Sequence, residues 1–189
     1  MKKKIILKEG SQEQKIYQML KQAGWFPGRK VDVSDVIKYY ENRNIKLSDK
    51  AIHFFEEYYG IEDYWDILYT WSINGENKGE HRGDFRFHLF PYPEQYRTDV
   101  RDLMYDDAEF TMKSEDYKSA LEYSKENIAL VGEIGYYYPA WVWIGESGKL
   151  YCTHDYNDDV LVFDTVIELM LHELSAHNNI IAMIMYSET

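Results

Sequence analysis

The pattern nearest to a catalytic motif lies near the C-terminus, where His172 and Glu173 are followed by His177. A zinc-protease helix carries two histidines at positions i and i+4, so that both imidazoles project from one face, with a glutamate as general base. Here the second histidine stands at i+5, which turns it about 140° away from the first on a helix. The spacing therefore favours ordinary histidines near a helix C-terminus, where the helix dipole stabilises positive charge.

A second concentration of polar side chains contains His81, Arg82, Asp84, Arg86 and His88. Catalysis there would need an adjacent nucleophile or paired carboxylates, and the pattern signals neither. His88 alternates with apolar neighbours, so we expect its side chain to face solvent or a partner beside Arg86. We interpret this stretch as a polar surface segment.

His154 and Asp155 stand close in sequence to Asp158 and Asp159, and together they could hold a divalent cation. Their spacing matches no calcium-binding loop, so a solvated acidic turn is the preferred interpretation. The chain also contains no glycine-rich phosphate loop, no Gly-x-Ser-x-Gly segment and no cluster of Cys and His. We therefore predict a protein that is not an enzyme and that holds no metal or cofactor. The least favoured alternative is a small metal-dependent hydrolase that uses His81, His88, His154 or His172.

Charge and composition limit the class of partner. The 189 residues carry a formal net charge of −12, which argues against nucleic acid or an anionic membrane and is compatible with a basic protein. Acidic charge also keeps many proteins soluble without any partner. The single cysteine, Cys152, permits no internal disulfide, and its place in a predicted strand indicates a buried thiol. No apolar run is long enough for a signal peptide or a membrane-spanning helix, so we predict a cytoplasmic protein.

A partner-binding surface is the remaining candidate, because acidic residues recur beside tyrosines along the chain. Carboxylates together with aromatic side chains are typical of surfaces that attract and bind a basic protein. Solvated helix faces explain any single acidic run equally well, so only convergence in space would favour binding. The candidate partner-binding residues are Asp102, Asp106, Asp107, Tyr137, Asp155, Asp158 and Asp159.

Amphipathic helices are the first elements that must position these residues. The apolar spacing predicts helices over 11–23, 34–43, 48–59 and 114–126, and a last helix that begins at Thr165. Ser11 and Gln14 form a capping box at the start of the first helix. Ser34 and Asp35 are expected to cap the second. The other expected N-cap residues are Ser48, Ser114 and Thr165.

A central sheet is predicted from residue 64 onward, where the hydrophobic period changes to two. The alternation predicts strands over 64–73 and 85–89, separated by a polar loop over 74–84 that begins with Asn-Gly. Trp141 and Trp143 lie in a buried strand, which a Gly-Glu-Ser-Gly turn connects to a second strand as an antiparallel hairpin. Shorter extended runs lie at 128–133 and 160–163. With no repeats or linkers, these elements predict one α+β domain over residues 1–189.

Four segments resemble a known family in their order along the chain. They are Gly24-Trp25-Phe26-Pro27-Gly28-Arg29, Leu130-Val131-Gly132-Glu133, Trp141-Val142-Trp143-Ile144 and Gly148-Lys149-Leu150-Tyr151. This succession resembles the third subgroup of the SUKH superfamily, bacterial immunity proteins related to the yeast Smi/Knr cell-wall regulators. The resemblance covers about residues 11–176. Segment 74–112 shows no matching feature, and residues 180–189 lie outside it.

The resemblance implies a cytosolic domain with a central, twisted, largely antiparallel sheet and flanking helices, and no catalysis. It also implies an antitoxin that binds and blocks a cognate polymorphic toxin, often a nuclease; a basic nuclease would suit the acidic charge. Gly24, Trp25, Pro27, Gly28 and Arg29 match the family motif. We interpret these five as structural, with Gly28 in a turn and Arg29 paired with a carboxylate such as Asp32.

The sequence leaves an alternative to immunity open. The protein could be a housekeeping interaction module of the same fold that has no toxin partner. Either protein would act as a monomer or a weak homodimer, and the sequence names neither the toxin nor the surface that binds it.

Overall fold

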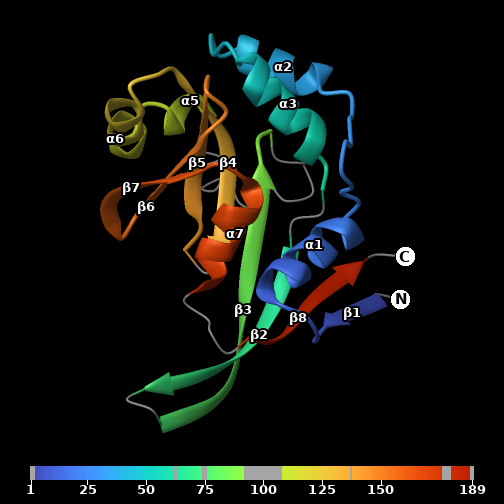
Figure 1. The fold of residues 1–189 in the computed structure, drawn as a ribbon. Helices are drawn as coiled ribbons and strands as arrows, with labels where there is room; N and C mark the ends of the chain where they lie inside the picture. The colour runs from blue at the N-terminus through green and yellow to red at the C-terminus, as the bar shows by residue number, and fades with distance from the viewer. Residues whose placement is uncertain are drawn as a thin grey trace.

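The computed structural model describes residues 3–61, 64–73, 76–91, 108–136, 138–175 and 180–187, and its centre is one antiparallel sheet. The strands are β1 (Lys3–Leu7), β2 (Tyr64–Ile73), β3 (Glu76–Leu89), β4 (Ile128–Tyr136), β5 (Ala140–Gly145), β6 (Leu150–His154), β7 (Asn157–Phe163) and β8 (Ile180–Ser187). Their order across the sheet is β1-β8-β2-β3-β4-β5-β6-β7 (Figure 1). Together with the helices, this sheet confirms the predicted α+β fold.

Both chain ends contribute strands that the sequence does not predict. β8 lies between β1 and β2, so that Met185 pairs with Ile5 on one side and with Trp65 on the other. The N- and C-termini therefore lie side by side (Figure 1). β1 has only five residues, and β8 is an almost unbroken apolar run, so neither shows the alternation that marks a half-buried strand.

The helices are α1 (Gln12–Gln22), α2 (Ser34–Glu41), α3 (Asp49–Tyr58), α5 (Ala108–Thr111), α6 (Glu115–Ser124) and α7 (Val166–Ser175). α1 begins with the predicted capping box: the Ser11 hydroxyl accepts from the Gln14 N–H, and the Gln14 side chain accepts from the Ser11 N–H. Ser48 and Ser114 cap α3 and α6 as predicted. Within the described ranges, every helix is too short or too polar to cross a membrane.

Of the other two helix starts, that of α2 differs from the prediction and that of α7 agrees with it. Neither Ser34 nor Asp35 caps α2; the Asp32 carboxylate does this from outside the helix, accepting from the N–H and hydroxyl of Ser34 at 2.9 and 2.5 Å. At α7 the Thr165 hydroxyl accepts from the Glu168 N–H as expected, at 3.1 Å. Short acidic side chains can cap from one or two residues upstream, so sequence alone leaves the capping residue ambiguous.

Strands β4, β5 and β6 are buried on both faces. In β5 the adjacent residues Val142 and Trp143 point to opposite faces of the sheet, yet both are fully buried. In β6, Cys152 and His154 lie on the face of α7, whereas Tyr151 reaches Glu126 just beyond α6. Helices α3 and α7 therefore cover one face of this half of the sheet, and α6 covers the other.

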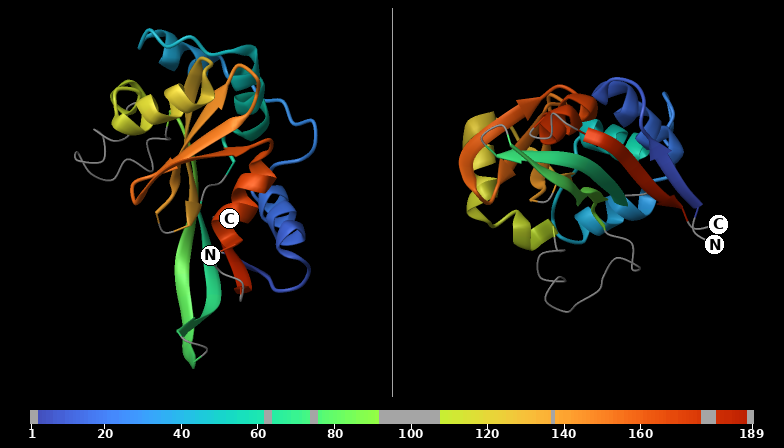
Figure 2. Two further views of the ribbon diagram at one scale, coloured as in Figure 1. Left: turned by 60° about the vertical axis from the view of Figure 1, so that its left-hand side comes forward. Right: turned by 90° about the horizontal axis from the view of Figure 1, so that it is seen from below.

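The predicted polar loop over 74–84 is wrong. Strand β3 begins at Glu76 and pairs with β2 as far as the end of that strand, where Ile73 lies opposite Glu76. β2 and β3 thus form a two-stranded ribbon that projects beyond the rest of the sheet (Figures 1 and 2). The first part of β3, residues 76–84, is largely polar, and a polar strand has the hydropathy of a loop. β2 keeps the apolar alternation, and its predicted range of 64–73 is confirmed.

The predicted hairpin is confirmed between β5 and β6. Trp143 pairs with Tyr151 and Ile144 with Leu150. The turn closes through two hydrogen bonds: the Gly145 N–H donates to the Lys149 carbonyl, and the Gly148 N–H donates to the Gly145 carbonyl. The two tryptophans differ in burial: Trp143 is fully buried, whereas Trp141 is partly exposed and packs against the edge of the core.

Glu126, just beyond α6, holds this hairpin turn. Its carboxylate accepts from the Ser147 N–H at 2.7 Å, from the Ser147 hydroxyl at 2.6 Å and from the Tyr151 hydroxyl at 2.6 Å. Burial by itself would raise the pKa of Glu126, but these hydrogen bonds to the charged form outweigh it and lower the pKa. The ionised carboxylate therefore ties the end of α6 to the β5–β6 turn.

Replacing Glu126 with Gln should reduce the free energy of unfolding by about 1–2 kcal/mol at neutral pH, because the charge-assisted hydrogen bonds weaken. A carboxylate with a lowered folded-state pKa contributes stability above its unfolded pKa of about 4.3 and loses it as the pH falls through the folded value. The difference between the native protein and E126Q should therefore begin to shrink near pH 4.3 and vanish only below the lowered folded-state pKa. Urea titrations at several pH values measure this difference.

The matched control is Glu146→Gln in the same turn, since Glu146 is exposed and accepts a single hydrogen bond from Asn127. It should change stability by less than about 0.5 kcal/mol. An E126Q effect that stays constant down to low pH would contradict the assigned role of the carboxylate.

Candidate functional site

The acidic residues at the β6–β7 turn are the described part of the predicted partner-binding surface. Asp155 lies in the turn, Asp158 and Asp159 lie in β7, and all three are exposed. The remaining candidates, Asp102, Asp106, Asp107 and Tyr137, lie outside the described residues. The structure thus brings part of the predicted set together on one turn.

Asp116 joins these residues from the first turn of α6. Its pKa is raised, first because it is partly buried and then because the charges of Asp155 and Asp158 oppose its ionisation. In the part of the chain that the structure describes, no Lys or Arg forms an ion pair with any of these carboxylates. Asp116 carries no local sequence signal, because only the packing of α6 against β6 and β7 brings it to this turn.

Two tyrosines stand beside the same turn. Tyr138, in the β4–β5 connection, is 59% exposed, and Tyr156, in the β6–β7 turn, is 66% exposed. Their ring centroids lie 6.3 Å apart. We use the name tyrosine–carboxylate face for the end of the sheet that carries Asp116, Tyr138, Asp155, Tyr156, Asp158 and Asp159. At this end the Tyr156 ring packs against His154 on the side of α7, whereas Asp116 lies on the side of α6 beside Thr153. The sequence does not single out Tyr138, because the run of tyrosines at 136–138 does not show which ring points outward. It does not single out Tyr156 either.

Beneath this face lies a buried pair of polar side chains. His154 Nε2 lies 2.9 Å from Glu173 Oε1, and the two side chains are only 4% and 6% exposed. Glu173 lies directly over Gly135, where a Cβ atom would collide with its carboxylate. His154 is thus held inside the protein against α7, so it does not join the turn carboxylates in the cation site that the sequence left open.

The other histidines have separate neighbours. His172 is exposed on α7 with its ring 5.3 Å from that of Phe163, and His177 lies outside the described residues. His88 does not face solvent as predicted: burial, followed by the charge of Arg86, lowers its pKa to about 4. The His81 ring lies 6.0 Å from the Tyr69 ring in the ribbon. Among the described residues, no three His, Cys, Asp or Glu side chains are grouped so that they could hold a metal ion.

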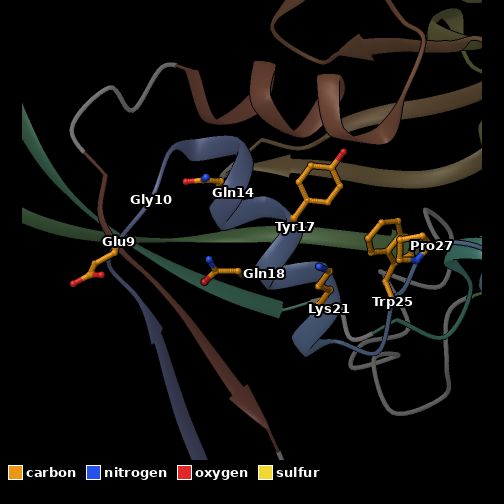
Figure 3. Close-up of a pocket in the computed structure, with 8 residues that line it drawn as sticks. All are labelled: Glu9, Gly10, Gln14, Tyr17, Gln18, Lys21, Trp25 and Pro27. Carbon is orange, nitrogen blue, oxygen red and sulfur yellow. The ribbon is translucent and has the colours of Figure 1, made fainter.

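A shallow groove of about 620 Å³ runs along the exposed side of α1. Figure 3 shows the side chains of Gln14, Tyr17 and Lys21 along the helix, with Trp25 at one end of the groove. Its charged lining residues are Glu9 and Lys21, and neither is hydrogen-bonded to a nucleophile. This lining does not form a general acid–base pair on a concave surface.

The Gly24–Arg29 motif fastens the chain to the C-terminus of α3. The Arg29 guanidinium donates to the backbone carbonyls of Glu57 and Tyr59, each at 2.8 Å. The Trp25 indole donates to the Glu57 carboxylate at 3.0 Å, and its ring stacks on Tyr58. The last carbonyls of a helix have no partner within the helix and attract positive charge, so Arg29 acts as a C-terminal cap.

Arg29 and the two glycines of this motif have separate structural roles. Arg29 does not pair with Asp32, because the Asp32 carboxylate is engaged at the start of α2 while the guanidinium reaches α3. Gly24 and Gly28 both have positive φ, at 102° and 76°, which only glycine adopts without strain. These two glycines are therefore the turn residues that the motif requires.

The fold is α+β, and acidic residues and exposed tyrosines lie at one end of its sheet. The sequence model of the SUKH-3 immunity protein family matches residues 12–171. The chain therefore belongs to the SUKH-3 immunity protein family, as its resemblance implied. It has no significant match among curated proteins or among solved structures.

Replacing Arg29 with Ala should reduce the free energy of unfolding by about 2–3 kcal/mol, because two carbonyls at the end of α3 lose a charged donor. Arg29→Lys should recover only part of this, since one ammonium group cannot reproduce the two-pronged geometry of a guanidinium. Urea denaturation of the three proteins measures the series.

Lys30 provides the control for this series. It forms an ion pair with Glu56 at 3.2 Å but its side chain is 69% exposed, so Lys30→Ala should cost less than about 1 kcal/mol. Equal stabilities for R29K and the native protein would show that the two-pronged cap does not matter.

Proposed function

We propose that this protein neutralises a cognate bacterial polymorphic toxin by binding it stoichiometrically, without catalysis. The observation that carries the proposal is the match to the SUKH-3 immunity protein family over residues 12–171. In this proposal the protein acts in the cytoplasm as a single domain over residues 1–189, as a monomer or a weak homodimer. It uses no metal or cofactor, and it contacts neither nucleic acid nor a membrane.

The charge of the protein supports a basic toxin, such as a nuclease domain. A nuclease that binds phosphates needs positive charge at its active site. A net charge of −12 attracts such a partner and accelerates encounter at low ionic strength. The tyrosine–carboxylate face is the described surface that suits this role best, because its carboxylates form no ion pair with Lys or Arg among the described residues and exposed tyrosines lie at the same end of the sheet.

Co-expression tests the proposal directly. The C-terminal domain of the toxin encoded beside this gene should kill bacteria when expressed alone, and co-expression of this protein should restore survival. The two proteins should then co-purify in a fixed ratio. Toxicity without rescue would overturn the proposal and would favour an interaction module with another client.

Charge reversal at Asp158 and Asp159 should weaken toxin binding while leaving the melting temperature nearly unchanged, because both residues are exposed. The association rate should fall several-fold at low salt, and its salt dependence should become shallower. Surface plasmon resonance with D158K/D159K at several ionic strengths measures both effects.

Asp35 and Glu41 on α2 offer a control with the same change in net charge, since both are exposed. D35K/E41K should slow association far less, if local charge at the β6–β7 turn guides the toxin. Equal effects of the two double variants would mean that only the overall charge matters.

A further inference from the structure

β7 is one edge of the sheet, because the strand order ends there and β6 is its only strand partner within the described ranges. Its residues 160–163 are Val-Leu-Val-Phe, all half-buried and typical of strands. An edge strand offers unpaired backbone groups to any extended chain, so proteins often block it with lysine or proline. The opposite edge strand, β1, contains Lys3 and Lys4, whereas β7 contains neither lysine nor proline and has only a bulge at its start.

Hydrogen bonds in the β5–β6 hairpin fix the direction of the backbone groups along β6. The Gly145 N–H donates to the Lys149 carbonyl at 3.0 Å, and the pairing of β5 with β6 has no register shift. Along an antiparallel strand, successive residues direct their N–H and C=O groups to opposite sides. Lys149 therefore faces β5, whereas Leu150 and Cys152 face β7.

The same alternation continues into β7. The partners of those two β6 residues are Phe163 and Leu161, which therefore direct their backbone groups to β6. The C=O of Val160 and both the N–H and the C=O of Val162 then point away from the sheet. Among the described residues, the Val162 N–H has no hydrogen-bond partner.

Side chains of the protein itself close both ends of this open segment. The Asp159 N–H donates to Asn157 Oδ1 at 3.0 Å. Beyond the strand, the Asp164 N–H donates to Glu168 Oε2 at 2.9 Å. Residues 160–163 are therefore the part of the edge that a partner strand can reach.

The charge next to the open segment selects the kind of strand that it would receive. Asp158 and Asp159 directly precede the segment, are exposed and form no ion pair with Lys or Arg among the described residues. An opposite charge across a strand pair stabilises the pairing. A second copy of this chain is disfavoured, because both molecules carry a net charge of −12 and repel each other.

We propose that an extended segment of the bound toxin pairs with residues 160–163 of β7 and adds a further strand to the sheet, with a basic residue opposite Asp158 or Asp159. The inference rests on the proposed function for the identity of the partner. In strand addition, main-chain hydrogen bonds supply affinity and alternate side chains supply specificity. The Val160 C=O and the Val162 N–H and C=O supply the main-chain contacts here.

Val162→Pro tests the pairing, because proline removes the outward N–H without removing a hydrogen bond to β6. Proline is tolerated in an edge strand where the N–H faces outward. V162P should bind the toxin domain encoded beside this gene about tenfold or more weakly, since one hydrogen bond is lost and the proline ring obstructs the incoming strand. Isothermal titration calorimetry with the native protein and V162P measures the loss.

Val162→Ala is the matched control, since it shortens the same side chain and keeps the N–H. It should bind the toxin domain within about twofold of the native protein, and its melting temperature should be close to that of V162P. Equal losses of affinity in V162A and V162P would show that the side chain, not the backbone, makes the contact, and would overturn the proposal. So would native affinity in V162P.

Amide hydrogen exchange followed by NMR tests the same edge without a variant. In the free native protein, the Val162 N–H should exchange faster than those of Leu161 and Phe163, which face β6. Addition of the toxin domain should slow Val162 exchange about tenfold or more. Slow exchange in the free protein would mean that the chain already covers this edge, and protection that grows with protein concentration would mean that a second copy does. Either result would overturn the proposal.

The co-expression assay separates this inference from the proposed function. Rescue by the native protein, with equally good rescue and toxin affinity in V162P, would sustain immunity and overturn the strand pairing. A native protein that neither rescues the cells nor binds the toxin domain would overturn both.

Discussion

The structure depends on covering β4, β5 and β6 on both faces. Three polar contacts hold the covering helices at their ends: Arg29 caps α3, Glu126 ties the end of α6 to the β5–β6 turn, and Glu173 of α7 reaches His154. Apolar contact alone would permit small shifts of a helix over a sheet. Directional hydrogen bonds at the helix ends restrict such shifts, because they tolerate little change in distance or angle.

The same contacts connect the fold to its proposed use. Glu173 and His154 fix α7 against β6, and the Tyr156 ring lies against His154 at the start of the following turn. The exposed β6–β7 turn thus directly follows β6, a strand that is buried on both faces. An immunity protein benefits from this arrangement, since a surface that is already rigid pays little entropy when it binds its toxin. The end of the sheet where β2 finishes and β3 begins, by contrast, projects beyond the helices (Figure 2).

Predictions from the sequence are correct where a local pattern determines the structure. The Ser11 capping box, the Ser48 and Ser114 caps and the Trp143 hairpin need only neighbouring residues, and all are present. The strand over 64–73 was also predicted correctly, whereas the loop over 74–84 was wrong, because the polar residues at the start of β3 lack the alternation that marks a strand. The expected pairing of Arg29 with Asp32 was wrong because the guanidinium donates to backbone carbonyls 28 and 30 residues away, and such a contact leaves no local pattern in the sequence.

The sequence by itself determined the fold class, the family and the acidic character of the protein, because composition, periodicity and motif order are properties of the chain alone. Only the tertiary structure decided which acidic residues and tyrosines stand together. Asp116 meets Asp155 through the packing of α6, and Tyr138 meets Tyr156 because two hairpin connections lie at one end of the sheet. Side chains this far apart in sequence carry no local signal of their contact, which the register and order of the strands create.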